Sequence, residues 1–329
     1  MTRLSFMLLL LAPLVPPASA DPLAHTFSIV ARDPQTGEMG VAVQSHWFSV
    51  GSIVTWAEAG VGAVATQSFV DPAYGPLGLA LMRSGKTPVQ ALEALLSIDP
   101  QAEVRQVAMI APTGPPAVHT GDAAIAAAGH YAGDEFAVQA NLMRNDRVWP
   151  AMAAAFRSAR GDLAVRMIAA LEAGQAAGGD IRGQQSAAIL VVRAEPTGKQ
   201  WVDRIFDLRV EDHPDPIAEL RRLVVLQRAY AHMNRGDELS AEKRWDEAMA
   251  EYRQGAALAP DIEELPYWVA VTLFTAGREA EALPIFREVF AKNADWVEVT
   301  RRLPASGLLP DDPAKLATIL AQAPGGANP

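Results

Sequence analysis

Hydroxyl, imidazole and charged side chains stand at the ends of the strands that the sequence predicts. They are Thr26, Ser45, Thr66, the His119-Thr120 pair, and Asp180 and Arg182 in one loop. Because strand ends open a sheet's edge to solvent, we expect these residues to converge in one cleft. A hydroxyl there would attack a carbonyl carbon, and an amide or backbone N–H would hold the oxyanion. Arg182 would bind an anionic part of the substrate, and Asp180 would orient either Arg182 or the base.

The familiar catalytic and ligand-binding motifs are missing from the sequence. Gly85-Lys86-Thr87 resembles the end of a phosphate-binding loop, but Ala80 replaces the glycine that must stand five positions earlier. The sequence has neither a Gly-x-Ser-x-Gly elbow nor a His-Glu-x-x-His helix. Its six histidines are scattered without metal-ligand spacing. We therefore expect neither a metal nor a cofactor.

Composition narrows the class of protein further. The chain contains no cysteine, which excludes a thiolate nucleophile, an iron–sulfur cluster and a disulfide framework. Its 28 basic and 38 acidic residues give a net charge of −10, which repels phosphate backbones, so we expect no nucleic-acid partner. With 329 residues, half of them hydrophobic, the chain is globular and long enough for two domains.

Residues 1–20 have the pattern of a secretory signal peptide. Arg3 forms a short basic start, residues 4–15 are apolar, and Ala18-Ser19-Ala20 matches a cleavage site of small residues. The apolar run is too short for a bilayer span, and no later segment supplies the ~20 apolar residues that a span requires. An uncleaved N-terminal anchor is the alternative. The sequence predicts an exported protein, periplasmic or secreted, that begins at Asp21 and has no membrane span.

Residues 21–215 predict groups of strands separated by two pairs of helices. The expected strands are 27–32, 40–44, 62–67, 106–111, 117–120, 136–140, 187–192 and 201–210. The expected helices are 77–83, a second one capped by Thr87, 148–159 and 163–173. Grouped strands favour an α+β fold with stacked sheets between helical layers over a doubly wound parallel sheet.

From Asp215 onward the pattern is entirely helical. We expect a helix over 216–233, capped by Asp215, to bridge two domains. Residues 234–322 then repeat at 34 residues, the period of tetratricopeptide repeats, and 323–329 form a tail. An ordinary amphipathic bundle is the alternative. The repeat pairs Leu239 with Leu273, Ala248 with Ala282, and Tyr252 with Phe286.

Six segments together carry a specific resemblance to a known family. They are TFSIVARD at 26–33, QSHWFSVG at 44–51, ATQS at 65–68, HTG at 119–121, GGDIRGQQSAA at 178–188 and DLRVEDHPDP at 207–216. Over residues 25–223 the chain resembles the bacterial family called domain of unknown function 1028. That family is grouped by fold with the N-terminal-nucleophile hydrolases. The resemblance implies a four-layer αββα sandwich, followed here by the tetratricopeptide-like helices.

The resemblance also implies a nucleophile at the first residue of the first strand, which here is Thr26. A free α-amine on Thr26, with a reference pKa of about 7.7–8.0, would act as the general base. Removal of residues 1–20 leaves five residues before Thr26, so this route requires a second cut after His25. The further catalytic residues that we expect are Ser45, Thr66, His119 and Asn141. The expected substrate-binding residues are Gln67, Thr120, Asp180, Arg182, Gln184 and Ser186.

Each of these residues also has a purely structural explanation. Thr26 can simply begin a strand, where threonine is favoured, and His119 can be a hydrogen-bonded histidine beside a turn. The glycine-rich segment 178–183 can end a helix with a solvated ion pair, and Gln184 and Ser186 can merely lead into a strand.

The sequence therefore predicts an exported hydrolase of amide or peptide-like C–N bonds, acting on a small molecule or a peptide. The helical repeats are expected to recruit a substrate or a protein partner. The alternative is a non-catalytic, hydrolase-like module that binds a small ligand or a protein and uses the repeats as a scaffold. Formation of a homo-oligomer is left open.

Overall fold

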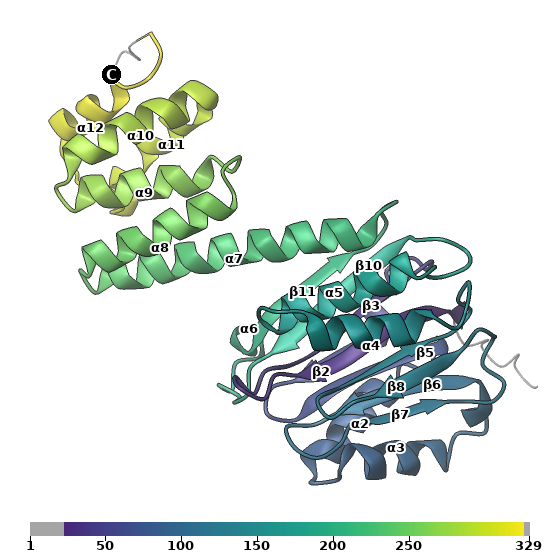
Figure 1. Ribbon diagram of the computed structural model, residues 1–329. Coiled ribbons are helices and arrows are strands. Elements are labelled where there is room, and N and C mark those ends of the chain that lie inside the picture. Colours follow the sequence, from purple (N-terminus) through teal and green to yellow (C-terminus); the bar gives the residue numbers. More distant parts are fainter. Residues whose placement is uncertain (1–22, 326–329) are drawn as a thin grey trace, which may run out of the picture.

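A region of strands and helices comes first along the chain, and an all-helical region follows (Figure 1). The computed structural model describes residues 23–325, so the predicted signal peptide and the end of the predicted tail lie outside the described residues. Antiparallel sheets precede an all-helical region, which confirms the expected α+β class. In the described part of the chain no helix combines the length and the apolar character needed to cross a membrane.

Six antiparallel strands form the larger sheet, in the order β11-β10-β3-β2-β9-β8. β2 and β3 make the predicted hairpin, whose turn begins at Asp33, a carboxylate that accepts the backbone N–H of Gln35. The strands are β2 (Thr26–Arg32), β3 (Met39–Ser45), β8 (Gly129–Ala132), β9 (Phe136–Ala140), β10 (Ser186–Val192) and β11 (Arg204–Val210).

Five strands form the second sheet, in the order β1-β5-β6-β7, with β4 also paired to β5. All pairings are antiparallel. The strands are β1 (Leu23–Ala24), β4 (Thr55–Glu58), β5 (Gly62–Phe69), β6 (Arg105–Ile110) and β7 (Ala117–Thr120). β1 and β2 follow one another in the chain but lie in different sheets, so the backbone crosses between the sheets just before Thr26.

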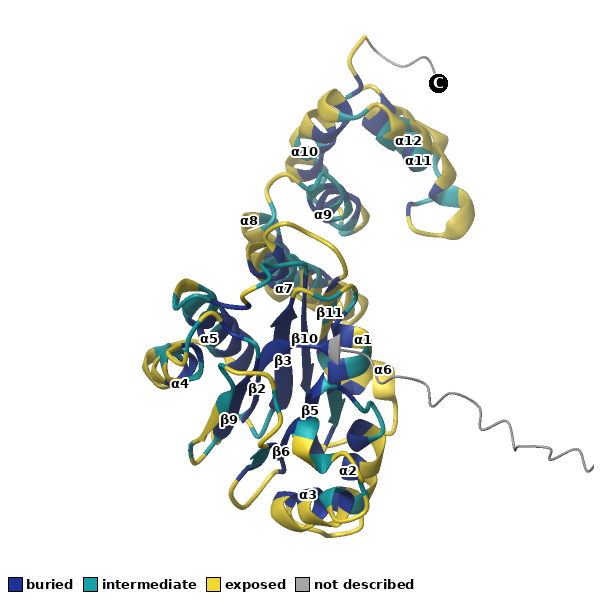
Figure 2. Cartoon of the chain, turned by 90° about the vertical axis from the view of Figure 1, so that its right-hand side faces the viewer, coloured by how far each residue is buried: buried dark blue, intermediate teal, exposed yellow. Residues whose placement is uncertain are grey.

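Two helix pairs cover the outer faces of the sheets, giving the four layers αββα (Figures 1 and 2). α4 (Val148–Ser158) and α5 (Leu163–Ala176) pack on the larger sheet, and α2 (Tyr74–Arg83) and α3 (Pro88–Leu96) pack on the smaller one. α3 begins with the predicted capping box between Thr87 and Gln90. In Figure 2 the central strands between these layers are buried.

The space between the sheets changes from apolar to polar along the strands. Because alternate residues of a strand share a face, Val30 is followed on the inner face of β2 by Ser28 and Thr26. β3 repeats the change, from Val41 and Val43 to Ser45. The inner faces of β5, β6 and β9 place glutamines at the same end. The polar end between the sheets therefore gathers side chains from five strands.

Several short elements differ from the expectations. Residues 200–203 form a helical turn, α6 (Gln200–Asp203), so β11 begins at Arg204 and the strand expected to begin at 201 is shorter. Four further elements were not predicted from the sequence: β1, β4, β8 and α1 (Gly51–Val54). These elements contain two to four residues, too few for a hydrophobic period to be recognisable.

α7 (Pro216–Ala241) connects the strand region to the helical region (Figure 1). It begins as predicted at Asp215, whose carboxylate accepts the N–H of Ala218. Its first half packs on the larger sheet through Ile217, Leu220 and Val224. The helix does not end at residue 233 as expected but continues to Ala241, because its second half packs against α8.

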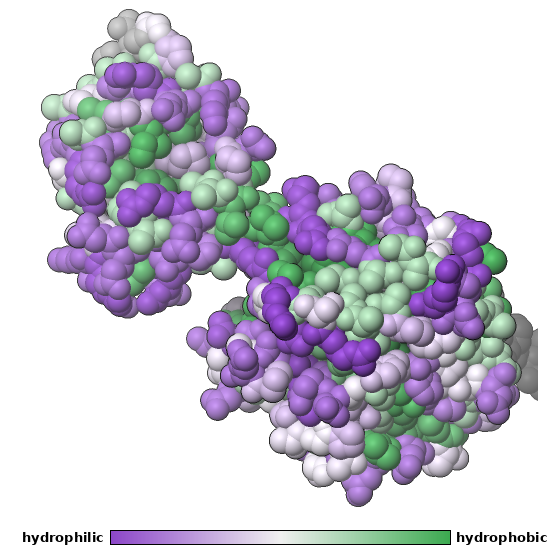
Figure 3. All heavy atoms as spheres, viewed as in Figure 1, coloured by the Kyte–Doolittle hydropathy of each residue, from purple (hydrophilic) through white to green (hydrophobic). Residues whose placement is uncertain are grey.

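The remaining helices repeat the 34-residue offset of the sequence. α8 (Trp245–Leu258) begins at 245 and α10 (Glu279–Lys292) at 279, each after a residue with positive φ, Lys243 and Gly277. On the face drawn in Figure 3, hydrophilic side chains cover most of this region, and apolar ones gather where α7 leaves the strands. The other helices are α9 (Glu264–Thr275), α11 (Asp295–Arg302) and α12 (Pro313–Leu320).

The close contact between α7 and α8 can be tested at Gly255. A Cβ there would stand 2.8 Å from the carbonyl oxygen of Ala229 in α7 and 3.2 Å from Sδ of Met233. Alanine stabilises a helix by about 1 kcal/mol over glycine, whereas overpacking costs about 1–3 kcal/mol. We expect Gly255→Ala to lower the free energy of unfolding, measured by urea denaturation.

The matched control for this variant is the reverse substitution at an exposed site of the same helix. Ala250→Gly should cost about 1 kcal/mol through helix propensity alone. A Gly255→Ala protein more stable than the wild type would contradict the close α7–α8 contact.

Candidate functional site

Buried amide side chains form a hydrogen-bonded network at the polar end between the sheets. Gln106 of β6 lies at its centre: its Oε1 accepts from Nε2 of Gln67 at 2.7 Å and from Nδ2 of Asn141 at 2.9 Å. Its Nε2 donates to Oγ1 of Thr120 at 2.9 Å. Because Nε2 of Gln106 also donates to the backbone carbonyl of Ala140 at 2.9 Å, the orientation of the Gln106 amide is determined. Asn141 must therefore turn Nδ2 toward Gln106, which leaves its Oδ1 facing away.

Thr26, the first residue of β2, lies beside this network and opposite Ser45 in the hairpin. Its hydroxyl donates to the carbonyl oxygen of Ala24 at 2.7 Å and lies 3.1 Å from Oγ of Ser45. Nε2 of Gln67 donates to the Thr26 carbonyl oxygen at 3.0 Å. Thr26, Ser45, Gln67 and Asn141 have no exposed surface. The hydroxyl is therefore buried and held by hydrogen bonds.

The carbonyl oxygen of His25, the residue before Thr26, is held by two donors. Oγ of Ser45 donates to it at 2.6 Å and Nη2 of Arg182 at 2.7 Å. Asp180 holds the guanidinium through Arg182 Nε at 3.0 Å and Nη2 at 2.7 Å, and its own side chain is fully buried. A hydroxyl and a cation converging on one carbonyl oxygen are the arrangement that stabilises an oxyanion.

The imidazole of His25 fills the space left beside Asn141. Its Nδ1 lies 2.9 Å from Oδ1 of Asn141, to which it donates, and its ring meets the edge of Phe69 at 5.9 Å between centroids. Burial lowers the pKa of His25 below its ordinary value, against the opposing effect of the Asn141 hydrogen bond. The ring is therefore neutral near pH 7.

The chain itself covers this site. Leu23 and Ala24 pair with Phe69 and Ser68 of β5, and the backbone then crosses to β2 at Thr26. Residues 23–25 thus lie over the polar end between the sheets. Among the groups around the His25 carbonyl, Arg182 reaches solvent, with 28% of its side chain exposed.

Two predicted residues lie elsewhere, and the expectation that they join Thr26 is wrong. Thr66 points to the outer face of its sheet, where its hydroxyl donates to the carbonyl of Asp71 at 3.0 Å. His119 also points outward, with Nε2 2.9 Å from the carbonyl oxygen of Ala102. Side chains alternate along a strand, so their neighbours Gln67 and Thr120 face inward instead. The His119-Thr120 pair is split between two faces.

The remaining predicted residues lie at the margin of the site. Thr120 Oγ1 contacts both Gln106 and Nδ1 of His130, the latter at 2.9 Å. Ser186 pairs with Ser45 in the sheet, but its hydroxyl donates to the carbonyl of Trp47 and accepts from the backbone N–H of Val50, so it holds the turn after β3. Oε1 of Gln184 is buried without a hydrogen-bond partner among the described residues.

Four residues of the site were not predicted from the sequence. They are His25, Gln106, Ser28 on the inner face of β2 and Gln139 on the inner face of β9. Ser28 donates to Oε1 of Gln67 at 2.6 Å, and Nε2 of Gln139 donates to the carbonyl of Ala65 at 3.1 Å. A usable signal existed, because each glutamine continues the inward-facing alternation of a strand whose other inward-facing residues are apolar, Ala108 and Ile110 in β6 and Ala137 in β9. No local signal distinguishes His25.

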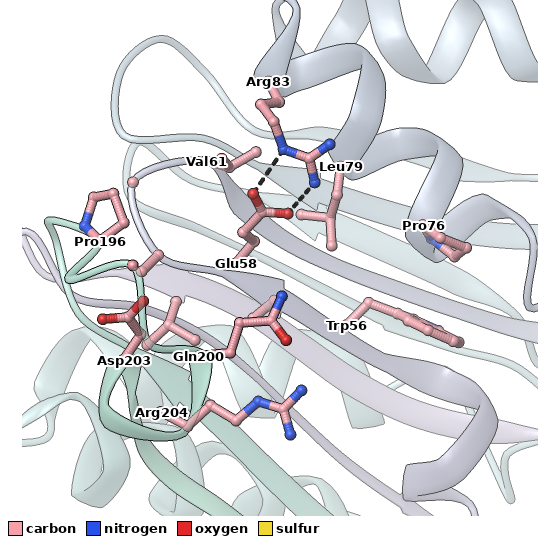
Figure 4. Close-up of a pocket in the computed structure, with 15 residues that line it drawn as sticks. Trp56, Glu58, Val61, Pro76, Leu79, Arg83, Pro196, Gln200, Asp203 and Arg204 are labelled. Carbon is pink, nitrogen blue, oxygen red and sulfur yellow. Dashed lines mark hydrogen bonds and ion pairs between the residues drawn. The ribbon is translucent and has the colours of Figure 1, made fainter.

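A separate hollow of about 580 Å³ opens at the other end of β5 (Figure 4). Trp56, Leu79 and Pro196 line it, and Arg83 pairs with Glu58 at its wall through Nε and Oε1 at 2.7 Å. None of the predicted site residues lines this hollow. Within residues 23–325 no three acidic or histidine side chains are grouped as metal ligands.

Comparisons with known proteins agree with the resemblance seen in the sequence. The model of a family of unknown function, DUF1028, matches residues 26–220. Among solved structures, the chain is similar to the protein SPO2555 from Silicibacter pomeroyi, which is described with the same family model. The two are 30% identical, with a TM-score of 0.56, over 61% of this chain and 85% of that chain. A comparison with curated proteins finds no match.

Titration of His25 should make the stability of the uncut chain depend on pH. The folded pKa lies below the ordinary value of 6.5, so the unfolded chain takes up a proton first as the pH falls. The contribution of the neutral His25 side chain to the free energy of unfolding is fully present above about pH 6.5. It is lost as the pH falls toward the folded pKa. We expect the Tm of a Thr26→Ala protein, which lacks the hydroxyl predicted to be the nucleophile, to fall between about pH 7 and 5.

The control is the double variant Thr26→Ala, His25→Asn, which keeps an N–H donor for Asn141 but does not titrate. Its Tm should fall less over the same range. The pKa of His130 is also lowered, by burial and by His119, but this effect is common to both proteins. An equal fall in Tm in both would contradict a buried, neutral His25.

Proposed function

The chain belongs to the DUF1028 family of unknown function, and we propose that it is a hydrolase of amide or peptide-like C–N bonds with Thr26 as its nucleophile. One observation carries the proposal: Ser45 and Arg182 both hold the carbonyl oxygen of His25, directly beside the Thr26 hydroxyl. The four-layer arrangement of sheets and helices, which agrees with that of N-terminal-nucleophile hydrolases, supports it. So does the position of Thr26 at the start of β2.

The first step is a cut of the chain's own bond between His25 and Thr26. Oγ1 of Thr26 attacks the His25 carbonyl carbon, and the developing oxyanion stays between Ser45 and Arg182. The C–N bond breaks, the hydroxyl proton passes to the released amine of Thr26, and an ester remains. Water hydrolyses this ester, leaving a carboxylate on His25 and a free hydroxyl and α-amine on Thr26.

The same groups then act on a substrate. The α-amine of Thr26, a type of group whose reference pKa is about 7.7–8.0, takes the hydroxyl proton as the hydroxyl attacks a substrate amide carbonyl. Ser45 and Arg182 hold the second oxyanion as they held the first. The proton passes to the leaving amine, and water then hydrolyses the acyl ester on Thr26. The hydrogen bond from Gln67 to the Thr26 carbonyl keeps the nucleophile in place.

We also propose that the protein is exported and that its helical region recruits a substrate or a partner. The basic, apolar and small-residue pattern of residues 1–20 supports export to the periplasm or the medium. The 34-residue offset between α8 and α10, with Ala248 and Ala282 both fully buried, supports a tetratricopeptide-like region that brings in a substrate or a partner.

A second candidate function is a non-catalytic module that binds a small ligand. The observation that favours it is the open hollow beside Trp56 and the Glu58–Arg83 pair, at a distance along β5 from the covered Thr26 (Figure 4). In that function Thr26 would never become an N-terminus.

Substitution of Thr26 distinguishes the hydrolase from the non-catalytic binding module. We expect the wild-type protein to yield a chain that begins at Thr26 in an intact-mass measurement, and Thr26→Ala to remain uncut and inactive. The melting temperature should change little, since the lost hydroxyl bond contributes about 1 kcal/mol. Ser45→Ala should slow the cut by about 10²–10³-fold, the usual cost of one oxyanion donor.

Thr66→Ala is the matched control, because Thr66 is also a buried strand threonine but faces the opposite side of its sheet. It should be cut as fast as the wild type. A wild-type chain that keeps residues 21–25, or full activity in Thr26→Ala, would eliminate the hydrolase and leave the binding module.

A further inference from the structure

We infer that the substrate is a peptide whose residue at the cleaved carbonyl is histidine, preceded by a small residue, bound where residues 23–25 lie in the uncut chain. We call this space the acyl groove. The inference rests on the proposed function and extends it from a reaction to a substrate class. It follows from the way in which the chain's own segment fills the groove.

The position that the substrate carbonyl must take determines where the side chain of the same substrate residue lies. Thr26 brings one hydroxyl, and Ser45 and Arg182 bring one pair of oxyanion donors, to one point. A substrate carbonyl must therefore take the place of the His25 carbonyl in order to react. The side chain next to that carbonyl then enters the space that the imidazole occupies in the uncut chain.

That space selects a flat side chain with an N–H donor. Asn141 turns Oδ1 toward it, because its Nδ2 is bonded to Oε1 of Gln106. Gln106 cannot turn over, since its own Nε2 donates to Thr120 and to the carbonyl of Ala140 at 2.9 Å. The Phe69 ring, which packs on the imidazole of His25, forms another wall. A side chain without a donor would leave a buried acceptor unpaired, which sites of this kind reject strongly.

The next position along the groove accepts only a small residue. Ala24 pairs with Ser68 across the edge of β5 and has no exposed surface. Leu23 pairs with Phe69, so the backbone of the segment runs antiparallel to β5, as in peptide recognition by strand addition. The end of β5 is itself held, because Arg105 donates to the Phe69 carbonyl at 2.6 Å and pairs with Asp99.

The experiment uses the self-cut protein after its N-terminal peptide has been removed by gel filtration. Three coumarin amides, Leu-Ala-His, Leu-Ala-Phe and Leu-Leu-His, are compared by kcat/KM. We expect the first to exceed each of the others at least tenfold, since phenylalanine lacks the donor and leucine does not fit at the position of Ala24. Binding of the peptides Asp-Pro-Leu-Ala-His and Asp-Pro-Leu-Ala-Phe is measured in parallel, and only the first should bind.

Asn141→Leu supplies the matched variant. It should bring the rates on Leu-Ala-His and Leu-Ala-Phe to within about threefold of each other, and the wild-type comparison decides the matter even if this variant does not fold. Equal rates on the three amides by the wild-type protein would overturn the inference and leave the hydrolase intact. Cut protein that binds the histidine peptide selectively but hydrolyses nothing supports the groove and refutes the hydrolase. A chain that is never cut refutes both.

Discussion

The burial of amide side chains between two sheets is the constraint on which the polar end of this fold depends. Each buried amide needs partners for its oxygen and its nitrogen, since an unpaired group costs about 1–3 kcal/mol. Gln106 meets this need from the centre, accepting from Gln67 and Asn141 and donating to Thr120. These bonds connect strands of both sheets and orient the groups around Thr26.

The path of the chain before Thr26 places a peptide carbonyl beside this network. Because β1 and β2 lie in different sheets, the backbone must cross the polar end, and the crossing presents the His25 carbonyl to Ser45 and Arg182. The buried Asp180 carboxylate holds the guanidinium in place. Ser45 and Arg182 therefore serve twice. They are the hydrogen-bond donors to the backbone carbonyl of His25 and the donors that the proposed reaction needs for its oxyanion.

Local patterns in the sequence predicted most elements of the fold. The β2–β3 hairpin, the Thr87 capping box and the Asp215 cap each depend on residues a few positions apart, so a single segment is enough to show them. The predicted end of α7, at residue 233, was wrong because packing against α8 continues the helix to Ala241. Of the candidate site, Thr26, Ser45, Asn141, Gln67 and Arg182 lie together, whereas Thr66 and His119 do not.

Periodicity and capping act within one turn or one hairpin, so the longer strands, the helix caps and the polar residues at strand ends could be predicted from the sequence. Which neighbour faces inward, Gln67 rather than Thr66 and Thr120 rather than His119, followed only from the folded structure, because facing depends on register and on which side each sheet is covered. The surroundings of His25 were decided in the same way. Its partners Asn141 and Arg182 stand 116 and 157 positions away in the chain, and only the packing of the sheets brings such distant groups together.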